Sequence, residues 1–127
     1  MSIERYNIAI IDNHTGVRHD LIGQLRTREN LTLVGVGVDA RDACKIAQNQ
    51  SPDIMVVGRD IPGGGVATVR AIKAIQQSTQ CIILAPDDDA KISEEVHQAG
   101  AIAYVKQEFL QHPLLRVIES VLSGKSV

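Results

Sequence analysis

Aromatic residues are scarce in this sequence: tryptophan is absent, and one phenylalanine and two tyrosines make up 2% of the 127 residues. Flavin rings are usually stacked against aromatic side chains, so this composition argues against a flavin ligand. An excess of basic residues is also absent, because 13 lysines and arginines face 15 aspartates and glutamates, giving a formal net charge of −2. Nucleic-acid-binding domains carry a basic surface, so we expect no direct nucleic-acid binding by this domain.

Cysteine is rare as well, and long hydrophobic runs are missing. Cys44 and Cys81 are far apart and do not have the spacing of metal ligands, so we expect two free, buried thiols in a reducing compartment. No apolar stretch approaches the roughly 20 residues that a helix needs to cross a bilayer. The start of the chain lacks the charged and apolar regions of a signal peptide. We therefore expect a cytoplasmic protein without membrane contact.

Short apolar runs are what the sequence does have. Four of them, residues 8–11, 54–57, 81–84 and 101–105, have the length and continuous apolar character of parallel strands covered on both faces. A fifth run, residues 31–38, alternates more and contains two glycines, which predicts an edge strand. Five stripes with helical spacing follow these runs, beginning at Val17, Ala40, Val66, Ile92 and Leu114.

This five-fold alternation of strand and helix predicts one α/β domain over residues 1–127. Its expected core is a doubly wound, five-stranded parallel sheet in the order 2-1-3-4-5, with helices on both faces. Ligands of such sheets bind at the carboxyl ends of the strands. The segments to inspect are therefore 12–14, 58–60, 85–87 and 106–108.

Four segments, read in order along the chain, resemble the receiver domains of two-component response regulators. Residues 10–14 resemble the Val-Asp-Asp-His that closes the first strand of these domains, and residues 52–63 resemble their Pro-Asp, four apolar residues, Asp and Met-Pro-Gly. Residues 100–105 resemble the Gly-Ala-x-Gly-Tyr segment, and residues 114–118 the start of the last helix. The similarity is strongest to the subfamily that carries a C-terminal helix-turn-helix DNA-binding domain. It implies a flavodoxin-like fold.

The resemblance also implies a set of phosphorylation-site groups, most of which this chain lacks. The nucleophilic aspartate is replaced by Gly58, and the two acids that hold Mg²⁺ correspond to Asp12 and Asn13. The hydroxyl position is Ala85. Spacing puts the lysine position at Gln107, while Lys106 is one residue away and its role stays open. We expect a degenerate site without aspartyl phosphate, resident metal or other cofactor.

Several residues near the strand ends have alternative interpretations. Asp60 is either a substitute nucleophile or, as we favour, a solvated loop acid. A zinc site formed by Asp12, His14 and Asp60 has no supporting ligand spacing. Glycines 63–65 suit either a phosphate cradle or, as we favour, a tight loop before a helix. Acids 87–89 are interpreted as a cap for the next helix rather than a metal cluster.

The functional hypothesis is a phosphorylation-independent regulatory module of transcription control, without enzymatic activity. Tyr104 matches the aromatic switch position of receivers, and without a phosphoryl group we expect it to stay turned inward. The expected partners are a second copy, bound through a face that includes the fifth helix, and a C-terminal DNA-binding domain or another protein. Two alternatives stay open: a small regulatory ligand in the crevice, and an enzyme or cofactor-binding protein on a flavodoxin-like scaffold.

Overall fold

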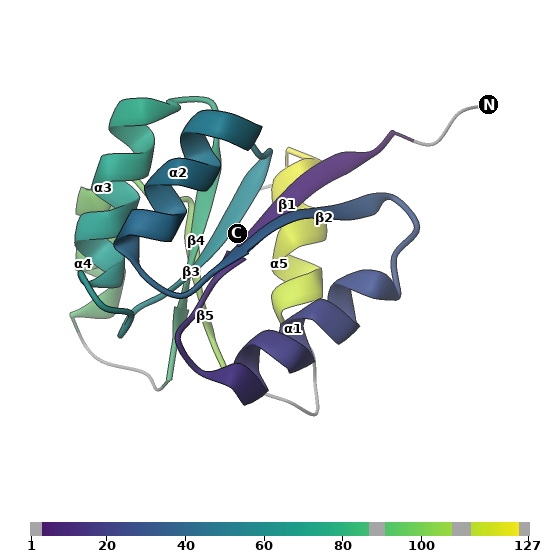
Figure 1. The fold of residues 1–127 in the computed structure, drawn as a ribbon, viewed down its shortest axis with the longest axis horizontal. Helices are drawn as coiled ribbons and strands as arrows, with labels where there is room; N and C mark the ends of the chain where they lie inside the picture. The colour runs from purple at the N-terminus through teal and green to yellow at the C-terminus, as the bar shows by residue number, and fades with distance from the viewer. Residues whose placement is uncertain (1–3, 87–90, 108–112, 125–127) are drawn as a thin grey trace.

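Five parallel strands form one sheet with five helices in the computed structural model, which describes residues 4–86, 91–107 and 113–124 (Figure 1). The elements, in chain order, are β1 (Tyr6–Ile11), α1 (Thr15–Arg26), β2 (Leu31–Gly37), α2 (Ala40–Gln50), β3 (Ile54–Gly58), α3 (Gly65–Ile75), β4 (Gln80–Ala85), α4 (Ile92–Ala99), β5 (Ala103–Lys106) and α5 (Pro113–Leu122). The strand order is β2-β1-β3-β4-β5, and all pairs are parallel. The predicted fold class and strand order are confirmed.

Two apolar layers lie on opposite faces of the sheet, and they explain why the strand sequences do not alternate. Met55 and Val57 of β3 point into a cluster with residues of α2, α3 and α4. Ile54 and Val56 point into a second cluster with residues of α1 and α5. Figure 1 shows α2, α3 and α4 on one side of the sheet and α1 and α5 on the other. Both faces of the central strands are dry, so both must be apolar.

Most apolar residues of the fifth helix, α5, pack into the core of the chain itself. Leu114, Leu115 and Ile118 are buried in the second cluster, and Val117 and Val121 pack against it half-buried. The apolar stripe that begins at Leu114 therefore packs largely within the fold.

The edge strand β2 contains glycines because helix α2 lies directly on it. A Cβ atom on Gly37 would lie 2.5 Å from Cβ of Asp42, and one on Gly35 would lie 2.9 Å from Cγ2 of Ile46. Real Cβ atoms do not approach other atoms this closely, so a larger residue at either position would push α2 away.

The run of three glycines builds the turn into α3. Gly63 and Gly64 have φ angles of 96° and 80°, which residues with a side chain rarely adopt. A Cβ on Gly65 would lie 2.5 Å from the carbonyl oxygen of Gly58 and 2.7 Å from Cα of Arg59. The Gly65 amide donates a 2.9 Å hydrogen bond to the Arg59 carbonyl. The glycines therefore fit the tight-loop interpretation and bring α3 onto the end of β3.

The two cysteines differ in their surroundings. Cys81 in β4 is fully buried, and this burial raises the pKa of its thiol to about 12. Cys44 in α2 is only half-buried, so the expectation of two buried thiols is wrong for this residue; the short helix leaves its side chain at the margin of the core. Within the described residues, both thiols are free and no helix is long and apolar enough to cross a membrane.

Replacing Gly65 with alanine should lower the free energy of unfolding by about 1–3 kcal/mol, because the added methyl group overlaps the backbone of residues 58 and 59. Gly23→Ala in α1 is the matched control, since a Cβ there meets nothing within 4 Å. The control should gain up to about 1 kcal/mol from the better helix propensity of alanine. Urea unfolding measures both, and equal stability of the two variants would contradict the packing argument.

Candidate functional site

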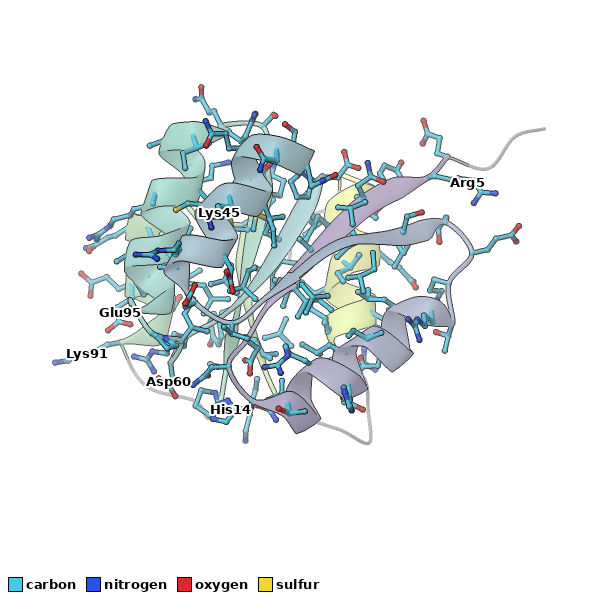
Figure 2. The ribbon with its side chains drawn as sticks, viewed as in Figure 1. Arg5, His14, Lys45, Asp60, Lys91 and Glu95 are labelled. Atoms are coloured by element: carbon cyan, nitrogen blue, oxygen red, sulfur yellow. The ribbon has the colours of Figure 1, made fainter. Side chains whose placement is uncertain are left out.

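The predicted site residues lie together at the carboxyl edge of the sheet. Gly58 ends β3, Ala85 ends the neighbouring β4, and Asp12 directly follows β1 on the other side of β3. Figure 2 shows His14 and Asp60 at this same end of the molecule. The topology thus brings segments from three strands to one place, as the sequence predicted.

The carboxylate of Asp12 fills the space that a side chain at position 58 would need. A Cβ atom built on Gly58 overlaps Oδ2 of Asp12 and lies 3.1 Å from Cγ2 of Ile61. Asp12 is only 5% exposed, so its carboxylate sits in the floor of the crevice rather than in solvent. A side chain at position 58 would therefore require the Asp12 carboxylate to move from its present place.

Three neighbours hold Asp12 in this place. The backbone amide of His14 donates a 2.8 Å hydrogen bond to Oδ1 of Asp12, and Nδ1 of the His14 ring lies 3.2 Å from the same oxygen. Arg18 of α1 donates from Nη1 to the Asp12 carbonyl at 2.8 Å. The Asp12 amide in turn donates to the Gly37 carbonyl at 3.0 Å. These contacts fix both the backbone and one carboxylate oxygen.

An ion pair joins the crevice to helix α4. Nη2 of Arg59 lies 2.9 Å from Oε2 of Glu95, and the two side chains are 19% and 38% exposed. Sequence reasoning did not single out Arg59, and no local signal pointed to it because its partner is 36 residues away. Asp60, the next residue, is exposed, which fits the loop-acid interpretation.

The two candidates for the lysine position both lie beside the α1–α5 face. Lys106 pairs with Ala85 in the sheet and is exposed, and the Gln107 amide donates to the Ala85 carbonyl at 2.8 Å. Both residues line a cavity of about 10 Å³ between α1 and α5, which is room for about one water molecule. Within the described residues, Lys106 forms no ion pair with Asp12 or Asp60.

Tyr104 is half-buried and packs against the cluster that contains Ala85. It also lines a surface hollow of about 360 Å³ between α4, β5 and α5, together with Val96, His97, Ile102 and Val117. Ala85 itself is completely buried and has no hydroxyl to offer. The lining of this hollow is mixed, because the polar side chains of Ser93 and His97 lie in it beside the apolar ones.

The other hypotheses for this edge find little support in the geometry. The described residues contain no group of three or more His, Cys, Asp or Glu side chains that could hold a metal ion, so the zinc hypothesis has no ligand set there. Acids 87–89 lie wholly outside the described residues, and their interpretation as a helix cap stays a prediction.

Adding a methyl group at position 58 tests whether the Asp12 carboxylate fills the space beside Gly58. We expect Gly58→Ala to lower the free energy of unfolding by about 1–3 kcal/mol, because it overlaps Oδ2 of Asp12. In the Asp12→Ala background the same change should be at least about 1 kcal/mol milder. Denaturant unfolding of the two single variants and the double variant measures this coupling, and strictly additive effects would mean that Asp12 does not fill the space.

The family comparison matches most of the chain. The response regulator receiver domain family matches residues 8–119. A putative transcriptional regulator from Pseudomonas aeruginosa is 26% identical over 118 residues, covering 92% of this chain and 56% of that protein. The response regulator UvrY from Escherichia coli is 26% identical over 120 residues, covering 94% and 55%. The chain therefore spans about half the length of the curated relatives that it matches.

Solved structures give the same result for the fold. A LuxR-family two-component response regulator from Aurantimonas superimposes with a TM-score of 0.90 at 25% identity, covering 97% of this chain and 89% of that one. The signal receiver domain of a putative response regulator NarL from Mycobacterium tuberculosis has a TM-score of 0.89 at 18% identity, covering 97% and 100%, which is a likeness of fold. With its fold, its strand-end segments and residues 8–119 all in agreement, this chain belongs to the response regulator receiver domain family.

Proposed function

We propose that this chain is a receiver domain that regulates through protein contacts without being phosphorylated. The observation that carries the proposal is the pair formed by Gly58 and Asp12. The position that matches the family's nucleophile has no side chain, and the Asp12 carboxylate fills the vacant space. A phosphoryl group has no acceptor oxygen at residue 58, and a new side chain there would have to displace the Asp12 carboxylate.

The residues at this edge do not fit the Mg²⁺ ion that receiver chemistry uses. Mg²⁺ requires an octahedral set of oxygen ligands and gives up its water reluctantly. Of the acidic positions that the resemblance implies, only Asp12 keeps a carboxylate, and Oδ1 of that carboxylate already accepts from the His14 amide. Asn13 is exposed and uncharged. No step of the proposed function therefore runs through a metal ion.

The chain also lacks the hydroxyl group that links phosphorylation to the aromatic switch residue in the family. In the family, a hydroxyl moves toward the phosphoryl group and an aromatic side chain follows it, but the position of that hydroxyl is Ala85 here. A ligand shifts a two-state equilibrium only by binding one state better, and without a phosphoryl group this difference is missing. We therefore propose that Tyr104 keeps one orientation, packed toward the Ala85 cluster, and that the face beside it is always presented.

The partner face that we propose is the surface of α4, β5 and α5. Ile102 is 40% exposed there, and it borders the hollow of about 360 Å³ together with Tyr104 and Val117. This is the part of the α5 surroundings where apolar side chains stay accessible, while Arg116 and Glu119 make the outer side of α5 polar. A second copy, a DNA-binding domain or another regulatory protein would bury these side chains.

Two rival functions are not favoured by the geometry. A small ligand in the crevice would compete with the Asp12 carboxylate for the same space, and none of the hollows described above is lined by Asp12, Gly58 or Ala85. For an enzyme on this scaffold, the described strand ends offer no nucleophile paired with a base, and the relatives named above are described as regulators. Transcription regulation is therefore the process in which we place the chain.

The purified chain should not gain the mass of a phosphoryl group on incubation with acetyl phosphate and Mg²⁺. Residue 58 has no carboxylate to attack the phosphodonor, and Asp60 is a solvated loop acid. Intact-mass spectrometry measures this, with UvrY treated identically as the positive control. Stoichiometric labelling of the wild-type chain that disappears in Asp60→Asn would overturn the proposal and identify Asp60 as the acceptor.

Ile102→Lys should weaken binding at the α4–β5–α5 face. The substitution puts a charge beside the hollow, and burying an unpaired charge is strongly unfavourable. Sedimentation of the chain at high micromolar concentration should show self-association that is reduced in Ile102→Lys. Ile75→Lys on α3 is the matched control, since Ile75 is also 40% exposed. Equal self-association of both variants would remove this face from the proposal.

A further inference from the structure

The two edges of the sheet are protected very differently. The β5 edge strand has four residues and ends on the exposed Lys106, and both a short length and a charge discourage pairing with another strand. The β2 edge strand has seven residues. From Leu31 to Val38 the chain contains no charged residue and no proline. Within the described residues, the β2 edge therefore has neither a charge nor a proline as a barrier to strand addition, and its one irregularity is the bulge at Val34.

The β2 edge also presents apolar side chains to solvent. Leu33 pairs with Ile8 and Gly35 pairs with Ala9, so Val34 is an extra residue in the strand. After this bulge Val36 lies beside Ile10 and points to the α1–α5 face, but α1 does not cover it. Val36 is 43% exposed and Val38 is 39% exposed, and with Ile75 and Ile102 they are the exposed large apolar residues of the described chain.

We propose that the β2 edge binds a second copy of this chain by antiparallel pairing of β2 with β2 about a twofold axis. The pairing joins the two five-stranded sheets into one and covers Val36 of both copies on the same face. The surface lies at the opposite sheet edge from β5, so the inference does not rest on the function proposed above.

Charges at the two ends of β2 favour this occupant and select one register. When Gly35 of one copy lies opposite Gly35 of the other, Val34 lies opposite Val36. Glu29, in the turn before β2 of each copy, then lies at the end of the strand where Arg41 of the other copy lies, in the first turn of α2. Glu29 and Arg41 are both exposed and form no ion pair within the described residues.

The neighbouring registers bring like charges together. A shift by one residue in one direction places Arg28 beside Arg41 of the other copy, and a shift by one residue in the other direction places Glu29 beside Asp42. Like charges across an interface suppress the wrong arrangement. The strand is thus complementary to itself in the register centred on Gly35.

Sedimentation equilibrium of the full chain tests the surface with four proteins: wild type, Val36→Lys, Ile102→Lys and the double variant. We expect Val36→Lys to weaken self-association by about tenfold or more relative to its parent, in both the wild-type and the Ile102→Lys background, because a lysine on an edge strand blocks pairing. Ile75→Lys controls for the added charge, and circular dichroism checks that each variant is folded.

The four proteins separate this inference from the function proposed above. If Val36→Lys self-associates as strongly as its parent in both backgrounds, or if the wild-type chain is monomeric at high micromolar concentration, the β2 surface is wrong. If Ile102→Lys leaves self-association unchanged while Val36→Lys weakens it, the proposal for the α4–β5–α5 face is wrong and the proposal for the β2 surface is supported.

Charge reversal tests the partner and the register without touching the strand itself. Glu29→Arg and Arg41→Glu should each weaken self-association by about tenfold, because each creates two like-charge contacts across the twofold axis. The double variant Glu29→Arg with Arg41→Glu should return to within about threefold of wild type, since the pairs are restored with the signs exchanged. If the loss of self-association in the double variant equals the sum of the losses in the two single variants, the proposed register is wrong.

Discussion

The backbone of Gly58 is enclosed from two directions, and the architecture of the site follows from this enclosure. From one side Gly65 brings the first turn of α3 within contact of the Gly58 carbonyl. From the other side the Asp12 carboxylate occupies the volume in which a side chain would begin. Residue 58 is also the last residue of the central strand β3. The start of α3, the end of β1 and the ion pair from Arg59 to α4 therefore all lie around the backbone of Gly58.

The charges around Gly58 are held by contacts that do not involve a phosphoryl group. Asp12 is held by the His14 amide and by Arg18, and Arg59 reaches Glu95 on α4. An ion pair that is partly buried is screened less by salt than one on the surface. The end of the sheet is thus connected to α4 by the ion pair between Arg59 and Glu95.

The fold could be predicted from the sequence because strands that are buried on both faces appear as continuous apolar runs. Short continuous apolar runs such as residues 54–57 are typical of buried parallel strands in a small domain. The strand β2 could be predicted as an edge strand from its alternation and its glycines. The side-chain arrangement of the site was less accessible. Asp12 was identified as a remaining acid, but its position in the space of residue 58 and the Arg59–Glu95 pair depend on distances between segments far apart in the chain. The half-exposed Cys44 was missed because helical spacing alone does not say where a short helix ends its contact with the core.

The strand order has a consequence for how the molecule is built during synthesis. β1 pairs with β2 and then with β3, β4 is added to β3, and β5 is added to β4. After β1 and β2, each strand of the sheet lies beside one that precedes it in the chain and is synthesised earlier. The last pieces added are β5 and α5, which complete the hollow beside Tyr104. A nascent chain therefore cannot complete the hollow beside Tyr104 until β5 and α5 have been synthesised.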